Sequence, residues 1–459
     1  MTAKRPRVER TLHPAAAAGS TLEMAASSNT SAVDFDVIVV GAGIAGCVTA
    51  YQLARAGHDV LVIERGAQPG AKNLSGGVLY SRVMEHPWPD FVHEAPVERI
   101  ITRNCLTFLN ARSHVTIDYR DERLANPVNA VSVLRARLDA WLGEQCEQAG
   151  ATVMPGVLVD SLVLEGDRVT GVRSGDDELR ARVVVAADGV NSFLCRNAGI
   201  RSPEPPRHFG LGVKSVIALP RDVLEDRFSL SGNEGVAYAV VGDCTKGLGG
   251  GGFLYTNRDS VSVGVVVRLD ELSQSAASSS DLHDHFLSHP AIAPLLKGGE
   301  LVEYGSHLIA EGGRAMVHDL TRPGLVVVGD AAGLTLNTGF TVRGMDLAAG
   351  SGIAAAKTIH AALAAGDTSG ARLAEYSAEL DRCFVGRDMK TFAKAPAFLE
   401  NRRMYGDYGQ LFADVLYGVY GLDTSPRRHL GPTCLGALRQ SPVKMRELAH
   451  DAVSAMGAL

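Results

Sequence analysis

Residues 35–65 contain the sequence feature that most constrains the fold, because they supply the parts of a dinucleotide-binding βαβ unit in order. The apolar run at 35–40 predicts a buried parallel strand, and the sequence Gly-Ala-Gly-Ile-Ala-Gly at 41–46 turns it directly into a helix. The free amides and the positive dipole end of such a helix suit a pyrophosphate. A glycine-rich turn without a ligand is the alternative, but the strand, the helix and a distal acid agree here.

The residues of this turn have separate predicted roles. Gly41 permits the tight turn, Gly43 lets a phosphate approach the backbone where a Cβ would block it, and Gly46 lets the helix lie against the strand. We expect Ile44 and Ala45, which lie between these glycines, to contact the cofactor as well.

A second strand is predicted over 58–63 and ends at Glu64, about 20 residues beyond the glycine turn. A carboxylate at this point accepts hydrogen bonds from a ribose diol, and it favours a ribose without a 2′-phosphate. The predicted cofactor is therefore FAD or NAD rather than NADP. We expect Arg65 to lie at the same site.

The size, charge and cysteine content of the chain limit its class of function. Its 459 residues exceed one ordinary core and predict two domains, or a nucleotide-binding domain with a large insertion. A net charge of -6 gives no general basic field, so no nucleic-acid partner is expected. The seven cysteines are widely spaced, without a CxxC pair, which predicts a reducing compartment and no iron–sulfur cluster bound by a standard motif.

No continuous apolar run approaches the roughly 20 residues that span a bilayer. The alanine-rich segment 352–365 predicts a helix packed on the sheet. Residues 1–34 combine a basic patch at 4–7 with Ala, Ser and Thr in no folding pattern, which predicts a disordered tail. An organellar transit peptide is the alternative for this tail, although its acidic residues count against it.

Two further segments are placed to reach an extended cofactor. The segment 131–149 has helical apolar spacing, and Arg135 near its start is predicted to contact a phosphate or a ribose, with a solvated arginine as the alternative. The loop 66–80 follows the second strand and is rich in small and hydrogen-bonding residues, with an ordinary surface loop as the alternative. The residues of this loop expected at the cofactor are Lys72, Asn73, Ser75, Gly76 and Gly77.

Two later strands end in small, acidic turns. The β-branched run at 181–187 leads into Asp188 and Gly189, and the run at 324–328 leads into Gly329 and Asp330. Because the carboxyl ends of parallel strands meet at one edge of a sheet, both turns are predicted to abut the same cofactor. The second turn is expected to open a helix whose positive end faces the pyrimidine end of a flavin.

The pattern changes to alternating strands after about residue 203, which predicts an antiparallel sheet inserted into the nucleotide-binding domain. The fold class is therefore α/β: a Rossmann-like FAD-binding domain, an inserted antiparallel β-sheet domain and a helical C-terminal region. The predicted bounds are 35–202 and 312–370 for the FAD-binding domain, 203–311 for the inserted substrate or acceptor domain, and 371–459 for the helical region; the predicted inserted strands are 211–219, 235–241, 252–256 and 260–267.

Three motifs far apart in the chain together resemble the FAD signature of the glutathione-reductase-2 flavoprotein superfamily: GAGIAG at 41–46, ADGVNS at 187–192 and GDAAG at 329–333. Additional stretches are similar to the FixC family, the flavoprotein component of the FixABCX electron-transfer complex. These are GAKNLSGGVLY at 70–80, GGGGFLYTN at 249–257, EGG at 311–313, NTGFTVRGMDLA at 337–348 and the segment 396–423. The resemblance covers nearly everything from residue 34 to about 423.

The resemblance implies noncovalent FAD bound in an extended form, with its adenosine end near the first glycine turn and Glu64. It implies that Arg135 and Asp330 hold the ribityl-pyrophosphate part, and that Val157 belongs to the same binding site. The residues that it places near the isoalloxazine are Gly339, Phe340, Gly344 and Met345.

The resemblance also implies an electron relay without a catalytic acid, base or metal in the chain, in which the chemistry belongs to the flavin. Electrons arrive from the subunits of an electron-transfer flavoprotein (FixA/FixB-like) and leave through a small ferredoxin-like protein (FixX-like) or directly to a membrane quinone. Gly250 and Gly251 resemble the glycine pair that lines the quinone pocket of larger relatives, with a close-packed β-turn as the alternative. A cytoplasmic protein with peripheral contact to the inner face of the membrane is expected.

Three other functions stay open at this point. A reductase of prenyl double bonds and a flavin hydroxylase use the same scaffold, and a flavin-bound subunit that scaffolds its partners is a third alternative. Whether the assembled complex bifurcates electrons is not decided by the sequence.

Overall fold

The structure, a computed structural model, describes residues 33–73 and 76–459. The prediction of a disordered tail therefore falls almost wholly outside the described residues. The folded unit comprises Val33–Leu459.

The first sheet has the strand order β16-β17-β10-β1-β2-β7, in which the strands from β17 to β7 pair in parallel and β16 is antiparallel at the edge. β1, β2 and β10 pair in parallel because their valine- and isoleucine-rich segments are buried on both faces. β8 and β9 form an antiparallel ribbon that continues from β10. The bounds are β1 Phe35–Val40, β2 Val60–Glu64, β7 Thr152–Pro155, β8 Ser161–Glu165, β9 Arg168–Ser174, β10 Asp177–Ala186, β16 Thr321–Arg322 and β17 Leu325–Val327.

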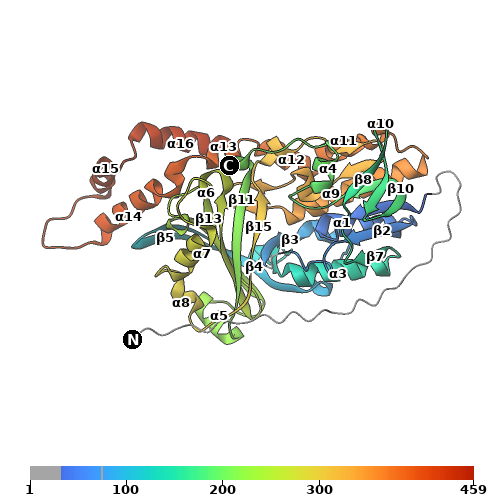
Figure 1. Ribbon diagram of the computed structural model, residues 1–459. Coiled ribbons are helices and arrows are strands. Elements are labelled where there is room, and N and C mark those ends of the chain that lie inside the picture. Colours follow the sequence, from blue (N-terminus) through green and yellow to red (C-terminus); the bar gives the residue numbers. More distant parts are fainter. Residues whose placement is uncertain (1–32, 74–75) are drawn as a thin grey trace, which may run out of the picture. The chain divides into compact units, whose positions relative to one another are not determined.

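Helices α1 (Ile44–Arg55), α3 (Arg135–Gln148) and α9 (Met345–Ala364) pack with this sheet into one hydrophobic core (Figure 1). α1 and α9 approach closely because their contact is made of small residues: a Cβ on Gly352 would lie 2.7 Å from the carbonyl oxygen of Ala45. Among the described residues, α9 is the one helix long and apolar enough to cross a membrane, but 72% of its apolar window is buried inside the protein.

The segment predicted as one helix over 131–149 is divided between a strand and a helix. β6 (Ala130–Val133) comes first, and α3 begins only at Arg135. Val131 and Val133 are fully buried where β6 pairs with β3, and β-branched residues favour a strand in such a position.

The second sheet has nine strands and is larger than the predicted insert. Its order is β15-β11-β14-β13-β12-β4-β6-β3, with β5 beside β4. Five strands come from the predicted 203–311 insert, but β3 to β6 come from the first half of the chain, so the boundary at 202 is wrong for this sheet. Its strands are β3 Gly77–Tyr80, β4 Val97–Asn110, β5 Ser113–Arg120, β6 Ala130–Val133, β11 Phe209–Ala218, β12 Glu234–Gly242, β13 Gly250–Thr256, β14 Ser260–Arg268 and β15 Glu300–Ala310.

The pairing of β4 with β12 is parallel, whereas the prediction was an antiparallel sheet. The two strands lie far apart in sequence, so no hairpin dictates their relative direction. β4 covers the edge that β12 would otherwise expose, which removes a row of unpaired backbone groups.

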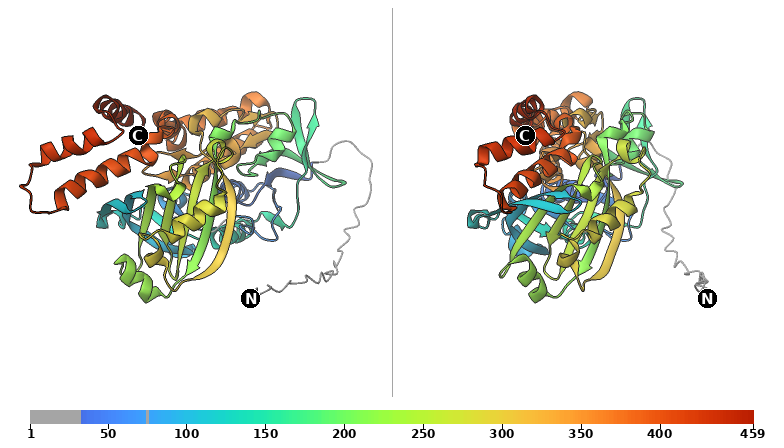
Figure 2. Two further views of the ribbon diagram at one scale, coloured as in Figure 1. Left: turned by 60° about the vertical axis from the view of Figure 1, so that its left-hand side comes forward. Right: turned by 90° about the vertical axis from the view of Figure 1, so that its left-hand side faces the viewer.

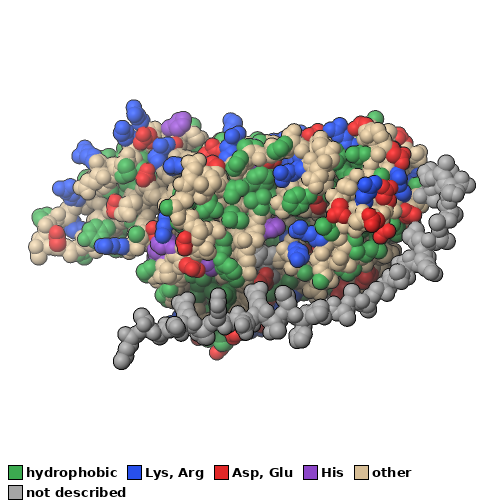
Figure 3. Space-filling view, viewed as in Figure 1, with side chains coloured by type: hydrophobic (Ala, Val, Ile, Leu, Met, Phe, Trp, Pro, Cys, Tyr) green, Lys and Arg blue, Asp and Glu red, His purple; other side chains and the backbone are tan. Residues whose placement is uncertain are grey.

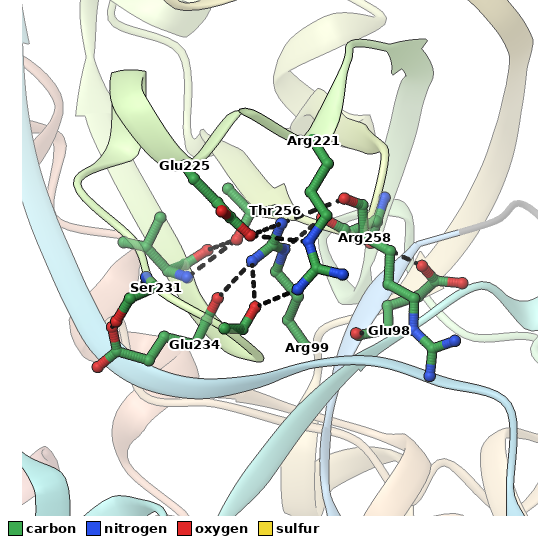
Figure 4. A network of polar contacts seen from close by, with 11 residues as sticks. Glu98, Arg99, Arg221, Glu225, Ser231, Glu234, Thr256 and Arg258 are labelled. Carbon is green, nitrogen blue, oxygen red and sulfur yellow. Dashed lines mark hydrogen bonds and ion pairs between the residues drawn. The ribbon is translucent and has the colours of Figure 1, made fainter. Parts of the chain in front are cut away.

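A buried arginine ties β4 to the turns at the end of this sheet (Figure 4). The Arg99 guanidinium donates to the carbonyl oxygens of Asn257 (2.6 Å), Arg258 (3.1 Å) and Glu234 (3.0 Å). Beside it, the Glu98 carboxylate accepts from the Arg258 amide at 3.1 Å. Arg99 thus binds backbone carbonyl groups at the start of β12 and in the turn between β13 and β14.

Several short helices connect the two sheets or cover the second sheet. They are η1 Ser81–Glu85, α2 Phe91–Glu94, η2 Glu122–Leu124, α4 Phe193–Asn197, η3 Pro206–His208, α5 Arg221–Phe228, η4 Asp243–Thr245, α6 Leu269–Leu272, α7 Ser279–Ser288, α8 Ala293–Leu296, η5 Gly313–Met316 and η6 Gly329–Ala332.

The C-terminal part, which was predicted to be helical over 371–459, consists of helices. α14 and α15 run side by side and project from the other elements (Figures 1 and 2), while α16 is held by Asp451, which accepts from Arg403 and Tyr408. The bounds are α10 Gly370–Leu373, α11 Glu375–Arg382, α12 Phe384–Thr391, α13 Ala395–Leu399, η7 Arg402–Tyr405, α14 Asp407–Tyr420, α15 Leu430–Gln440 and α16 Met445–Ala458.

Candidate flavin-binding site

A large cavity of about 1390 Å³ connects the carboxyl ends of the first sheet to one face of the second. Its wall includes the ends of β1, β2 and β10 on one side and residues of β11, β13 and β14 on the other. Small-molecule pockets usually measure roughly 300–1,000 Å³. This cavity can therefore hold an extended dinucleotide together with a second molecule.

The glycine turn after β1 has the geometry that the sequence predicts. Gly41 has a φ of +108°, and a Cβ there would lie 2.3 Å from the carbonyl oxygen of Ala187. A Cβ on Gly46 would lie 2.0 Å from the carbonyl oxygen of Gly41, so Gly46 serves close packing and lies outside the cavity wall. A Cβ on Gly43 would meet, among the described residues, a single atom within 4 Å, an Arg135 nitrogen at 3.7 Å.

A side chain at Gly43 would therefore point into the cavity and would not clash with the surrounding protein. It caps α1 in an extended conformation, without a side-chain cap, and the first amides of the helix are left for a ligand. Ile44 and Ala45 line the cavity beside it.

The Glu64 carboxylate is held at the end of β2 by two backbone amides. One oxygen accepts from Ala42 at 3.0 Å and the other from Gly66 at 2.6 Å. Each oxygen keeps a further lone pair for a hydroxyl group. Arg65 and Val157 line the cavity next to it, and the Val157 amide donates to the Glu64 carbonyl at 3.0 Å.

Arg135 is an ordered arginine at the cavity wall rather than a solvated one. It makes two hydrogen bonds to the buried Asp139, at 2.8 and 2.7 Å, and Asn73 donates to the same carboxylate at 2.5 Å. The pair holds the guanidinium close to Gly43, where a phosphate would lie. Lys72 lines the cavity nearby. The predicted contact Ser75 lies outside the described residues.

Asp188 and Asp330 lie at the ends of two parallel strands, and both line the cavity. Burial raises the pKa of Asp330, and the positive charge of Arg135 lowers it in part. Burial also raises the pKa of Asp188, of which one oxygen accepts from the Leu194 amide at 3.0 Å. The other oxygen is buried and finds no hydrogen-bond partner among the described residues.

Gly189 and Gly329 both have positive φ, of +78° and +61°. Gly189 lines the cavity, whereas Gly329 lies outside its wall, where a Cβ would come within 2.8 Å of the Ala45 Cβ. The cofactor contact of Gly329 stays a prediction, while its backbone lies against α1. Its glycine is needed because the turn packs against α1.

The turn at 329–333 does not open a long helix, contrary to the prediction. Gly329–Ala332 is a short 3₁₀ turn that ends at Gly333, which has a φ of +73°. A left-handed residue there redirects the chain into a hairpin of β18 (Leu336–Asn337) and β19 (Val342–Arg343). The helix that follows this hairpin is α9, and its first residue, Met345, lines the cavity.

The hairpin and the start of α9 supply the four residues predicted near the isoalloxazine. All four line the cavity: Gly339, Phe340, Gly344 and Met345. Phe340 is 66% exposed, so it stands at the opening rather than in the interior. Gly76 and Gly77 also line the cavity, and a Cβ on Gly77 would come within 2.9 Å of the Met345 side chain.

Gly250 and Gly251 line the cavity as the first residues of β13, not in a turn before it. A Cβ on Gly250 would lie 2.0 Å from the Val266 carbonyl oxygen, and one on Gly251 would lie 2.7 Å from that of Val240. The glycines let β13 pack between two neighbouring strands while leaving their cavity side open. The strand predicted over 252–256 thus begins earlier, because pairing with β14 begins at Gly250.

Among the charged residues of the cavity wall that the sequence reasoning did not place there, Lys214 and Glu311 have strongly shifted pKa values. The Lys214 ammonium donates to the Gly76 carbonyl and lies 5.3 Å from the centre of the Phe253 ring; burial, together with Arg135, lowers the pKa of Lys214 to about 8. Burial raises the pKa of Glu311 to about 7, which the charge of Arg268 opposes. The signal for Lys214 was a single charge inside an apolar strand.

The comparisons with known proteins agree with this geometry. Residues 36–126 match the family model described as FAD dependent oxidoreductase, and residues 209–309 match the one described as ETF-QO, ubiquinone-binding. The chain is 47% identical over 426 residues to the probable electron transfer flavoprotein-quinone oxidoreductase YdiS of Escherichia coli K12, covering 93% of this chain and 99% of that protein. It is 46% identical over 392 residues to the protein FixC of Escherichia coli O157:H7, covering 85% and 91%.

This chain belongs to the FixC family of flavoproteins. It is an FAD-dependent oxidoreductase related to the electron-transfer-flavoprotein:quinone oxidoreductases, as the sequence motifs indicate. Solved structures confirm the fold. A geranylgeranyl bacteriochlorophyll reductase-like protein from Thermoplasma acidophilum superposes with a TM-score of 0.69 at 20% identity, covering 92% of this chain and 99% of that one. The halogenase PltM superposes with a TM-score of 0.60 at 14% identity, covering 91% and 86%.

The cavity of this FixC-family chain fits FAD. The open space at Gly43, the clamped carboxylate of Glu64 and the ordered guanidinium of Arg135 suit a pyrophosphate and its ribose. Asp330 presents a buried carboxyl to a sugar hydroxyl further along. When bound, FAD supplies the redox chemistry. The chain itself would orient the dinucleotide. Lys214 places a positive charge in the cavity wall, where a low dielectric strengthens its attraction to a negative charge.

All seven cysteines lie in the described part of the chain, five of them buried and two half-buried. Within residues 33–73 and 76–459, no three or more His, Cys, Asp or Glu side chains form a group that could hold a metal ion.

Proposed function

We propose that this chain accepts electrons from an electron-transfer flavoprotein onto FAD and passes them to a quinone, as the FixC-like subunit of a FixABCX-type complex. The observation that carries the proposal is the continuity of the cavity. One wall holds the FAD-binding turn, and the other holds Gly250 and Gly251, in a segment that matches the ubiquinone-binding model.

The acceptor end of the cavity has a composition that suits a quinone ring. Phe253 and Tyr255 stack with ring centres 5.2 Å apart, and Gly250–Gly252 leave space beside them. A flat, largely apolar ring needs such a slot, with few polar groups to orient it. Lys214 and Glu311 provide polar groups at the wall.

The test uses the purified, FAD-loaded protein under anaerobic conditions. Reduction of the flavin by a reduced electron-transfer flavoprotein, but not by NADH, is expected. Reoxidation by a short-chain ubiquinone analogue is then followed by flavin absorbance. Rapid bleaching by NADH alone would favour a hydroxylase, and a flavin that no donor reduces would favour a scaffolding subunit.

A small ferredoxin-like protein is proposed as a second partner, on the resemblance to the FixC component. The electrons would pass through its cluster on the way to the quinone. Addition of the candidate ferredoxin to the reduced protein tests this, because cluster reduction is visible by electron paramagnetic resonance. An unchanged cluster spectrum would leave the direct route to quinone.

We also propose that the protein is cytoplasmic and that α14, α15 and α16 lie on the inner face of the membrane, where quinone is available. These helices expose large apolar side chains, with Tyr417 and Tyr420 each 78% exposed, and exposed basic residues lie among them (Figure 3). The further exposed apolar residues are Phe412, Leu416, Leu430, Leu435, Met445, Val453 and Met456; the basic ones are Arg427, Arg428, Arg439, Lys444 and Arg446. Exposed apolar and basic side chains on the same helices suit an anionic lipid surface.

Sedimentation with lipid vesicles tests this contact. The protein is expected to sediment with vesicles that contain phosphatidylglycerol and to be released by high salt only in part, since apolar contacts persist. The double variant Tyr417→Ser, Tyr420→Ser should lose most binding while keeping its flavin. Tyr119→Ser, an exposed tyrosine on β5, is the matched control. Equal binding by both variants would contradict the placement.

A further inference from the structure

Three titratable side chains form a chain beside the cavity, separate from the groups that hold FAD. The His208 Nδ1 atom lies 2.7 Å from one oxygen of Glu204. The other oxygen of Glu204 lies 3.4 Å from the Nε2 atom of His318. His208 lines the cavity, Glu204 is 9% exposed, and His318 is 34% exposed. The three groups thus run from the solvent to the cavity wall.

Glu204, the middle of these three side chains, has one oxygen without a hydrogen-bond partner among the described residues. This oxygen, Oε1, is buried. The Ser192 Oγ atom is buried and unpaired in the same way, and both residues line a small cavity of about 70 Å³. Buried polar atoms are nearly always paired, so such groups need an explanation. A polar cavity of this size has room for a water molecule.

At its inner end the chain reaches the acceptor side of the cavity. The His208 carbonyl oxygen accepts from the amides of Glu311 (2.8 Å) and Gly312 (3.2 Å). The imidazole packs on Gly312, where a Cβ would lie 2.7 Å from the ring. Glu311 and Arg268 line the cavity beside it.

The charged group that faces Glu204 from the other side is Arg201. Its guanidinium donates to the carbonyl oxygens of Ala331 and Met316, and it lies 3.7 Å from Glu204 Oε1. Arg201 is therefore committed to backbone acceptors, and its guanidinium faces the Glu204 side chain between the two histidines. An imidazole can accept a proton at one ring nitrogen and release one from the other.

We propose that His318, Glu204 and His208 conduct protons from the solvent to the cavity during quinone reduction. This rests on the proposed function. Reduction of a quinone takes up two electrons and two protons, and each carbonyl oxygen becomes a hydroxyl. The electrons come from the bound flavin, which the electron-transfer flavoprotein refills. Over a full turnover, in which the flavin returns to its starting state, the two protons of the quinol come from bulk water, and their path is from His318 to Glu204 and then to His208.

The experiment follows reoxidation of the reduced, FAD-loaded protein by a short-chain ubiquinone analogue in a stopped-flow instrument. His208→Gln and His318→Gln remove proton transfer while keeping a hydrogen-bond donor. Both are expected to lower kcat about tenfold or more, with KM for the quinone unchanged. Imidazole added to the buffer should restore part of the rate, and deuterated water should slow the variants more than the wild type.

His285→Gln is the matched control. His285 also pairs with a carboxylate, at 2.7 Å from Asp243, and lies outside the cavity wall, so wild-type rates are expected. His318→Gln keeps the test valid if His208→Gln does not fold, because His318 is partly exposed. Wild-type rates in both variants overturn the relay, as does slowing that neither imidazole nor deuterated water alters. A wild-type protein that reduces no quinone overturns the proposed function, and the relay with it.

Discussion

Replacement of Gly43 by valine separates cofactor binding from folding. The backbone of Gly43 has a φ of -82°, which every residue adopts, and its Cβ direction meets only an Arg135 nitrogen at 3.7 Å among the described residues. In the apoprotein the substitution therefore costs only the loss of a favourable N-cap residue, about 1 kcal/mol.

The effect on FAD binding is expected to be much larger. A side chain at Gly43 occupies the space through which the phosphates reach the helix amides. Loss of two hydrogen bonds to a charged group, at about 1.5–3 kcal/mol each, amounts to about 3–6 kcal/mol. At 1.4 kcal/mol per factor of ten, this weakens FAD binding by about 10²- to 10⁴-fold.

Gly46→Ala is the control for this prediction, because its Cβ would lie 2.0 Å from the Gly41 carbonyl oxygen. This variant should lower the stability of the apoprotein by at least about 1–3 kcal/mol through overpacking. Denaturant unfolding of both apoproteins and calorimetric titration with FAD provide the measurements. Wild-type FAD affinity in Gly43→Val would refute the pyrophosphate position, and an apoprotein as unstable as Gly46→Ala would refute the open space.

Three other variants test separate parts of the structure. Asp330→Ala should weaken FAD retention on desalting without altering binding of the electron-transfer flavoprotein; unchanged retention would place the sugar elsewhere. Lys214→Met should stabilise the apoprotein at pH 7 by up to about 3 kcal/mol, because the fall of the Lys214 pKa from 10.5 to about 8 is the cost of burying its charge. In the wild type the unfolded state binds more protons between pH 8 and 10.5, so stability should rise with pH through that window, whereas Lys214→Met should show no such rise. Arg99→Met should lower the free energy of unfolding by about 3–5 kcal/mol, because it leaves buried carbonyl groups unpaired, while FAD affinity of the folded protein stays unchanged.

The FAD-binding half of the fold could be predicted because its signals are local. A buried strand, a glycine turn and an amphipathic helix follow one another within 35–65, and each depends on neighbouring residues only. The two later strand ends were predicted to meet the same cofactor for a general reason, since parallel strands share one carboxyl edge. Asp188 and Asp330 do line one cavity.

The second sheet could be predicted only in part. Four of its later strands follow from alternation and turn residues, whereas β15 was not predicted, and β4 has no local sign that it joins them. Its place depends on an edge that β12, more than 120 residues later, would leave unpaired. Similarly, α9 begins only at Met345 because a left-handed Gly333 and a hairpin precede it. The hydrophobic periodicity of the sequence indicates neither feature.

By itself, the sequence determined the chemistry of the molecule: a glycine turn for a pyrophosphate, an acid for a ribose and the motifs of one flavoprotein family. These depend on residue type and short spacing, which a linear pattern records. Only the tertiary structure decided which glycines serve the cofactor and which serve packing, and that Lys214 and the chain from His318 to His208 reach the cavity. The physical reason is that these roles depend on which distant backbone or carboxylate group lies within a few ångströms, and residues 204 and 318 are brought together only by the folded chain.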